Sequence, residues 1–402
     1  MGLDVFAFCQ LRSSDEVAST GDHAALGFRS APKSAKAAAK EYIEAATPSS
    51  LSSLTLSTPI PTARNIDQHH DSRIHHQDRT SPIHDAMASK RILTIFGATG
   101  NQGGSVIDAV LARPALSAKY ALRGITRDPS SSKSKALASQ GVELVQGELD
   151  DLESLKTALA GSYGVFGVTD YWSLKGPNPK AKEIQLGKNI FLASQAAGVK
   201  HLVFSSLPNV DKLSGGKYPG VEHFDGKAEI GDFIEANKGD MIASYYMPAM
   251  FIDFGKTLVK NINGTPTLSL PFPNLDVPWP LLAPRRDGGK WVVGLFEAGE
   301  RANGTHVQGV STWTTPNKLV KELSEFLGKE VKFNQISGEV FGSFLPEPIR
   351  ADLTDMMLWI GDKGYYGPGA KEKQEASDSF LPKDADLIDW PTFVKTSGPW
   401  DV

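Results

Sequence analysis

The sequence has little of what builds covalent cross-links or membrane spans. Cys9 is the only cysteine among 402 residues, which excludes a disulfide within the chain and a cysteine-pair redox switch. No run approaches the roughly 20 apolar residues of a membrane-spanning helix, and no basic flank precedes an apolar core near residue 1. We therefore expect no membrane segment and no secretion signal, and place the protein in the cytosol, with access to the nucleus left open.

An excess of basic residues is also missing. The chain carries 42 Lys and Arg residues against 46 Asp and Glu residues, a formal net charge of -4 at pH 7. Proteins that bind nucleic acids usually present a broad basic surface. The composition therefore argues against direct nucleic-acid binding, whereas 40% hydrophobic residues suffice for a sizeable globular core.

The first 88 residues differ in composition from the rest. Serine, threonine, alanine and proline dominate them, and apolar periodicity is short. Such segments bury too little apolar surface to fold, so we expect residues 1–88 to form a disordered extension. The histidines between His69 and His84 fit a flexible tail better than a metal site, and we predict no bound metal. Met87, just before the first core strand, is a candidate alternative translation start.

A glycine-rich turn stands between an apolar strand pattern at 92–96 and a helical pattern that contains Val106 and Ile107. Residues 97–103 read GATGNQG. Glycines permit a tight turn and a close approach of the backbone to a diphosphate, and the helix N-terminus offers unpaired N–H groups to the anion. The spacing is one residue longer in its first interval than the usual dinucleotide fingerprint. A surrounding strand–helix–strand unit must therefore support the interpretation.

The chain after Arg91 supplies that context. Strand patterns alternate with helical patterns, which predicts an α/β fold with a Rossmann-type doubly wound parallel sheet. The strands are expected at 92–96, 120–126, 142–145, 165–168, 201–205 and 241–246. The regularity fails after Pro248, and prolines between 271 and 286 predict long loops. We assign 89–250 to a dinucleotide-binding domain and 251–402 to a smaller α+β lobe, interleaved with that core, for a substrate or partner.

Arg127 ends the second predicted strand, near the position where such folds contact the adenosine ribose. An arginine can bind a 2′-phosphate through two hydrogen bonds, whereas a carboxylate would bind a free 2′-hydroxyl. Arg127 therefore favours NADP(H) over NAD(H), and Lys133 adds positive charge. Two alternatives stay open: Asp128 could serve a ribose if the register shifts by one residue, and Arg127 could be a solvated residue at a strand end.

The sequence resembles the NmrA-like family of atypical short-chain dehydrogenase/reductases. The resemblance rests on the turn at 97–103 and on the segments TDYW at 169–172, HFDGK at 223–227 and PAMF at 248–251, and it runs from about Lys90 to the C-terminus. It implies a Rossmann fold that binds NADP(H). Some relatives are described as oxidoreductases, and others sense the cofactor ratio and regulate a protein partner such as a transcription factor.

The resemblance also implies which residues contact NADP(H). The diphosphate turn comprises Gly97, Ala98, Thr99, Gly100, Asn101 and Gln102. From the adenosine end to the nicotinamide end, the other implied positions are Arg127, Ser131 and Lys133, then Glu148 and Leu149, then Thr169 and Asp170, then Lys227, and finally Met250, Phe251, Ile252 and Asp253. Ser131 stands where some relatives carry a second basic residue, so Lys133 would have to replace that charge.

The tyrosine of the usual Tyr-x-x-x-Lys motif is missing. In that motif the lysine lowers the tyrosine pKa and orients the cofactor ribose. Here His223 lies four residues before Lys227, one helical turn away. A histidine could act as the general acid because its ordinary pKa of about 6.5 suits proton transfer near neutrality. It could equally well only pack beside the cofactor. Weaker candidates are Ser205, Ser206, Tyr171 and Tyr218.

Two functions follow from these patterns. The first is an NADP(H)-dependent oxidoreductase for a small organic carbonyl or a related substrate. The alternative is a non-catalytic sensor of NADPH and NADP+ that regulates a protein partner, which the missing tyrosine favours and which would need different affinities in its two states. The sequence identifies neither a substrate nor a partner, and it predicts no oligomeric state.

Overall fold

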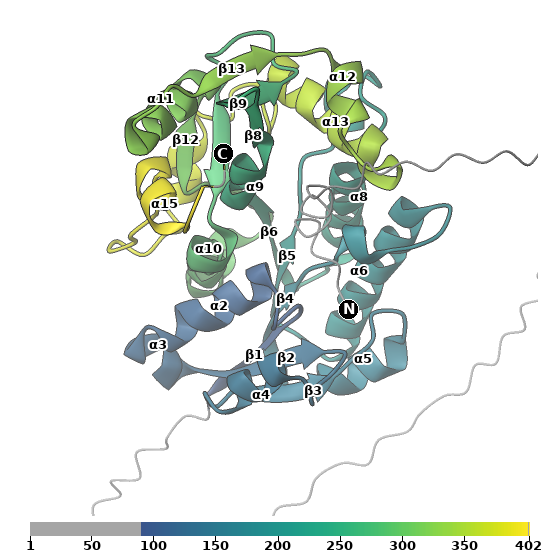
Figure 1. The fold of residues 1–402 in the computed structure, drawn as a ribbon. Coiled ribbons are helices and arrows are strands. Elements are labelled where there is room, and N and C mark those ends of the chain that lie inside the picture. Colours follow the sequence, from purple (N-terminus) through teal and green to yellow (C-terminus); the bar gives the residue numbers. More distant parts are fainter. Residues whose placement is uncertain (1–89, 401) are drawn as a thin grey trace, which may run out of the picture. The chain divides into compact units, whose positions relative to one another are not determined.

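A parallel sheet of seven strands forms the centre of the protein in this computed structural model, which describes residues 90–400 and 402 (Figure 1). The strands run in the order β11 (His306–Gly309), β6 (Ile242–Pro248), β5 (His201–Ser205), β4 (Ser162–Gly167), β1 (Arg91–Ile95), β2 (Tyr120–Thr126) and β3 (Glu143–Gln146). All neighbouring pairs are parallel. The sequence 3-2-1-4-5-6 is the Rossmann order, which confirms the predicted doubly wound sheet. The expectations for residues 1–88 lie outside the described residues.

Helices cover both faces of this sheet because its strands send side chains alternately to either side (Figure 1). On β5, Val203 joins one hydrophobic cluster, whereas Leu202 and Phe204 join the other. One face packs against α2 (Asn101–Leu111) and α10 (Pro284–Ala298), and the other against α5 (Leu152–Ala158), α6 (Pro179–Ala196) and α8 (Glu222–Asn237). The shorter helices of this part are α3 (Pro114–Lys119), α4 (Ser132–Ala138), α7 (Val210–Ser214) and the 3-10 turn η1 (Tyr171–Ser173).

Residues after Pro248 form two small sheets and further helices, which confirms a smaller C-terminal α+β region. One sheet consists of β12 (Thr312–Thr314), β10 (Trp279–Leu282) and β7 (Met250–Phe251), and the other of β13 (Lys332–Gln335), β9 (Thr265–Leu270) and β8 (Val259–Ile262). The remaining helical elements are α9 (Ile252–Leu258), η2 (Gly299–Ala302), α11 (Pro316–Leu327), α12 (Gly338–Ser343), α13 (Glu347–Lys363), α14 (Gln374–Asp378) and α15 (Trp390–Thr396). Strand β11 lies within this later stretch of sequence but joins the Rossmann sheet beside β6.

The prediction of long loops between 271 and 286 holds for 271–278, which form no helix or strand, and is wrong for the rest of the segment. Strand β10 lies inside this segment, and α10 begins directly after it at Pro284. Proline is well tolerated at the first position of a helix because its missing N–H would have no intrahelical acceptor there. Pro284 therefore marks a helix start rather than a loop.

Helices α2 and α10 approach each other so closely that only glycine fits between them. A Cβ atom on Gly289 would lie 2.1 Å from the carbonyl oxygen of Ser105, and one on Gly104 would lie 1.3 Å from Nη1 of Arg285. The Arg285 guanidinium donates to the carbonyl oxygen of Gly100 at 3.1 Å and pairs with Asp108 at 2.8 Å. The later part of the chain thus packs directly on the helix that follows the glycine-rich turn. Within residues 90–400 and 402, we find no helix of the length and apolarity that crossing a bilayer requires.

Candidate cofactor and catalytic site

The glycine-rich turn connects β1 to α2 in the way that a phosphate site requires. Gly97 has a left-handed backbone with φ +62°, which favours glycine. A Cβ atom on Gly103 would lie 2.3 Å from the carbonyl oxygen of Phe96, so the helix can start against the strand only with glycine there. Gly100 caps α2 without a side chain, which leaves the N–H groups of the first turn without an acceptor. This arrangement fits a diphosphate.

The other residues of the turn differ in exposure. Ala98 is fully buried, Thr99 and Gln102 are half-buried, and Asn101 is exposed. The side chain of Gln102 accepts a hydrogen bond from the Ser205 hydroxyl at 2.7 Å, which ties the first turn of α2 to the end of β5.

Arg127 extends from the end of β2 as an exposed cation. It forms no hydrogen bond or ion pair with the described residues, and neither does exposed Lys133. Asp128 accepts hydrogen bonds from the hydroxyl of Ser130 at 2.6 Å and from its backbone N–H at 2.8 Å, and these bonds hold the pKa of that carboxyl below its usual range. Ser131 caps α4 by accepting from the backbone N–H of Ser134. The arginine is thus available to a ligand, whereas Asp128 is already engaged.

The predicted cofactor contacts after β3 and β4 directly follow the ends of these two strands. Glu148 and Asp170 are exposed, and Leu149 is half-buried with its carbonyl oxygen accepting from the Asn189 amide at 2.8 Å. Thr169 is buried, with 5% of its surface exposed. These residues line up with the turn and Arg127 at the carboxyl edge of the sheet, where doubly wound folds bind ligands.

Lys227 forms a buried ion pair that the sequence did not reveal. Its Nζ atom donates to Oε1 of Glu183, and the same oxygen accepts from the Thr169 hydroxyl at 2.7 Å. Glu183 is fully buried, and its second oxygen, Oε2, has no hydrogen-bond partner within residues 90–400 and 402. A Cβ atom at Gly226 would lie 3.0 Å from that oxygen, so the glycine lets this carboxylate approach α8 closely. The lysine of α8 is therefore held by a carboxylate of α6.

His223, one turn before Lys227, also meets a buried carboxylate. Its Nδ1 atom contacts Oδ1 of Asp352, and its backbone N–H donates to Oδ2 of the same residue at 3.1 Å. Asp352 lies on α13, far along the chain, and nothing in the sequence singled it out. The rings of Trp172 and Phe224 pack against the imidazole with centroids 4.9 and 4.7 Å away.

The weaker candidates are all engaged in hydrogen bonds. Besides Ser205, which donates to Gln102, Ser206 donates to the carbonyl oxygen of Lys227 at 3.2 Å. The Tyr218 phenol donates to Asp362 at 3.0 Å. The Tyr171 phenol donates to Glu222 at 3.0 Å, and burial, with the charge of Asp352 and this hydrogen bond, raises the pKa of Tyr171.

The segment expected at the nicotinamide end turns from β7 into α9. Met250 is buried, and its sulfur accepts a hydrogen bond from the Trp279 indole at 3.2 Å. Ile252 is fully buried, Phe251 is half-buried, and Asp253 is exposed. In the described part of the chain, no hydrogen bond or ion pair links Asp253 to Lys227 or His223. Hydrogen bonds do connect the turn to β5, Lys227 to Ser206 after β5, and Lys227 through Glu183 to Thr169 after β4.

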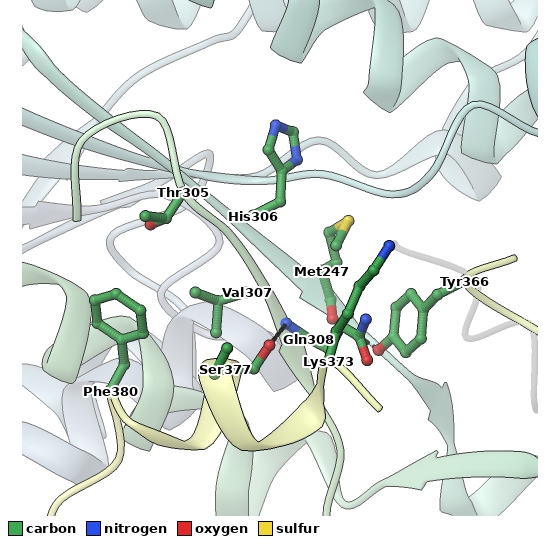
Figure 2. Close-up of a pocket in the computed structure, with 10 residues that line it drawn as sticks. Met247, Thr305, His306, Val307, Gln308, Tyr366, Lys373, Ser377 and Phe380 are labelled. Atoms are coloured by element: carbon green, nitrogen blue, oxygen red, sulfur yellow. Dashed lines mark hydrogen bonds between the residues drawn. The ribbon is translucent and has the colours of Figure 1, made fainter. Parts of the chain in front are cut away.

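A cavity of about 420 Å³ lies elsewhere, between β11 and α14 (Figure 2). Its lining includes His306, Gln308, Lys373, Ser377 and Phe380 and contains no predicted site residue. The backbone N–H of Gln308 donates to the Ser377 hydroxyl at 3.0 Å, and burial lowers the pKa of His306. Among the described residues we find no cluster of three side chains that could hold a metal ion.

Comparison with known proteins identifies the family. The model of the NmrA-like family matches residues 89–397. The NmrA-like family domain-containing oxidoreductase himF of Aspergillus japonicus is 32% identical over 304 residues, which cover 71% of this chain and 89% of that relative. The crystal structure of Nmra, a negative transcriptional regulator, in complex with NADP superposes on this chain with a TM-score of 0.61 at 18% sequence identity. The superposition covers 76% of this chain and 95% of the Nmra chain. The same protein has also been solved in complex with NAD. The chain belongs to the NmrA-like family.

Proposed function

We propose that this protein is an NADP(H)-dependent oxidoreductase that acts on a small organic carbonyl or a related substrate. The observation that carries the proposal is a pair of buried acid–base contacts one helical turn apart on α8, His223 with Asp352 and Lys227 with Glu183. Buried ionisable groups that meet specific charge partners are typical of active sites. Relatives at about this level of similarity, such as himF, are named as oxidoreductases.

The choice of NADP(H) rests on Arg127. Its guanidinium has no competing partner among the described residues, and it extends from the strand end where the adenosine ribose binds in this fold. We propose that Arg127 and Lys133 bind the 2′-phosphate, with Ser131 at the same strand end. The other proposed cofactor contacts are Gly97 to Gln102, Glu148, Leu149, Thr169, Asp170, Lys227, Met250, Phe251, Ile252 and Asp253.

NADPH, when bound, supplies a hydride to the carbonyl carbon. We assign to Lys227 the contact with the nicotinamide ribose, with Glu183 compensating its charge in the buried site. His223 gives the proton that the carbonyl oxygen takes up as its bond to carbon becomes single. Hydride and proton together convert the carbonyl to an alcohol, and the neutral imidazole regains its proton from solvent.

A non-catalytic cofactor sensor is the second candidate. The phenols of Tyr171 and Tyr218 both donate to carboxylates, so neither stands free in the role of the missing tyrosine. The fold is shared with Nmra, which is described as a negative transcriptional regulator. Under this alternative the site would bind NADPH and NADP+ unequally and pass the difference to a protein partner. We place either activity in the cytosol, with nuclear access in the regulatory case.

Binding and turnover of the full chain separate the two candidates. Dissociation constants for NADPH and NADP+ come from titration, and NADPH oxidation is followed with benzaldehyde, cyclohex-2-enone and 1,2-naphthoquinone. Saturable, carbonyl-dependent oxidation supports the reductase, and it should be lost in His223→Gln but kept in His306→Gln, a matched change far from the turn. Tight cofactor binding without turnover of any of the three carbonyls contradicts the reductase and favours the sensor.

A further inference from the structure

We infer that Asp352 is a positioning residue that fixes the tautomer of His223 and leaves its Nε2 atom to face the substrate. The inference rests on the proposed reductase function and names the residue that would make the histidine an effective proton donor. No motif carries it, because Asp352 is 129 residues away from His223 in sequence.

The contact between the two residues uses both carboxylate oxygens. Oδ1 meets the ring nitrogen Nδ1, and Oδ2 accepts the backbone N–H of His223 at 3.1 Å. An ionised carboxylate can only accept hydrogen bonds, so Nδ1 must carry a proton. The proton that the ring can transfer is therefore the one on Nε2. The Asp352 side chain holds both the backbone and the ring of His223.

The Nε2 atom has no hydrogen-bond partner among the described residues, although the imidazole is largely enclosed. About a tenth of the side chain, 11%, remains exposed. The rings of Trp172 and Phe224 and, at 5.9 Å, that of Tyr171 border the imidazole and limit its rotation. The free nitrogen is thus both unpaired and held in one orientation.

The charged groups near the imidazole are mostly paired with each other. Lys227 is neutralised by Glu183 in the adjacent pair, and Glu222 accepts from the Tyr171 phenol. Asp352 is the carboxylate in direct contact with the ring. Of the nearby titratable groups, Asp352 of α13 and Tyr171 of η1 lie against the ring of His223, whereas Glu222 and Lys227 are one and four residues away from it on α8. When Nε2–H gives its proton to the substrate oxygen, Nδ1 keeps its own on Asp352.

Helix α13, which carries Asp352, also accepts hydrogen bonds from residues that precede His223. Asp355 accepts the backbone N–H of Gly220 at 2.9 Å, and Asp362 accepts the phenol of Tyr218 at 3.0 Å. Three aspartates of α13 therefore bind Tyr218, Gly220 and His223, which lie before and within the first turn of α8. Only Asp352 touches the imidazole, which makes Asp355→Asn a matched control for Asp352→Asn.

The test measures the tautomer of His223 directly and needs no substrate. The full chain is labelled with 15N-histidine, its ring nitrogens are observed by NMR, and the signal of His223 is identified by its loss in His223→Gln. We expect a protonated Nδ1 and an unprotonated Nε2 when the ring is neutral, the opposite of the form that free histidine prefers. Asp352→Asn should abolish this preference, Asp355→Asn should keep it, and Asp352→Glu should restore it in part.

Kinetics with 1,2-naphthoquinone and NADPH provide the second measurement. Asp352→Asn should lower kcat about a hundredfold with little change in KM or in the dissociation constant of NADPH. A wild-type ring protonated on Nε2, or an unchanged tautomer in Asp352→Asn, overturns the inference even in an active reductase. The expected tautomer without turnover of any carbonyl refutes the proposed function instead, and with it the role in proton delivery.

Discussion

Replacing Arg127 by alanine should weaken NADPH binding by roughly 10- to 150-fold and leave NADH binding almost unchanged. The guanidinium is exposed and has no partner among the described residues, so its removal leaves no buried group unsatisfied. A surface change of this kind should alter the free energy of unfolding by no more than about 0.5 kcal/mol. Any change in affinity therefore reports on the ligand contact and not on the fold.

The size of the effect follows from the chemistry of the proposed contact. A hydrogen bond to a charged group contributes roughly 1.5–3 kcal/mol. Since about 1.4 kcal/mol corresponds to a tenfold change, the dissociation constant of NADPH should rise roughly 10- to 150-fold. The loss should shrink as salt increases, because an exposed ion pair is screened. NADH lacks the 2′-phosphate, so the same variant should bind it like the wild type.

The measurement is a titration of the full chain with NADPH and with NADH at two salt concentrations. Arg301→Ala, which removes an exposed arginine from η2, serves as the control and should leave both affinities unchanged. Asp128→Ala tests the alternative register, in which that carboxylate binds the ribose of NADH. Equal weakening of NADPH and NADH in Arg127→Ala would refute the assignment of the 2′-phosphate to this residue.

Three further predictions concern the buried groups. Glu183→Ala should lower the free energy of unfolding by about 3–5 kcal/mol in urea titrations, because it leaves the Lys227 charge buried without a partner. The double variant Glu183→Ala with Lys227→Met should recover part of this loss. An unchanged stability of Glu183→Ala would contradict the proposed ion pair. Gly103→Ala should weaken NADPH binding and lower Tm more than Gly100→Ala does. The Cβ added at residue 103 would lie 2.3 Å from a backbone oxygen, whereas the one added at residue 100 would lie 3.2 Å from one. Equal effects of the two variants would count against the tight turn. Burial lowers the pKa of His201 to about 4. As the pH falls below about 6.5, the unfolded chain therefore takes up a proton that the folded chain does not. The free energy of unfolding should drop by about 1.4 kcal/mol per pH unit between about pH 6 and 5. His201→Gln should flatten that slope in urea titrations at each pH, and an unchanged slope would show that another group causes it.

Local patterns predicted the elements that depend on neighbouring residues in the sequence. The apolar strands and the turn at 97–103 follow from short runs of side chains and from glycine geometry, and the order of the sheet agrees with them. The position of Arg127 at the end of the second strand could be predicted because the residue directly follows that strand in the sequence. Each of these features is decided within a few residues of the chain.

The partners of the acid–base residues could not be predicted in this way. Glu183 and Asp352 lie 44 and 129 residues from Lys227 and His223, respectively, and α13 carries other carboxylates besides Asp352. Only the packing of the helices determines which carboxylate is buried. The start of α10 was missed for a different reason, since the prolines around it were interpreted as loop residues although Pro284 suits the first helical position.

The late position of β11 in the sequence has a consequence for synthesis on the ribosome. Six strands of the sheet are complete once Pro248 has emerged, but the strand that covers the outer edge of β6 arrives only with His306–Gly309. Until then β6 exposes a row of unpaired backbone groups, which is a template for pairing with other chains. A nascent or truncated chain that stops between these two points would thus be prone to aggregate, and the cell would need to shield it for the whole time that the intervening residues are being translated.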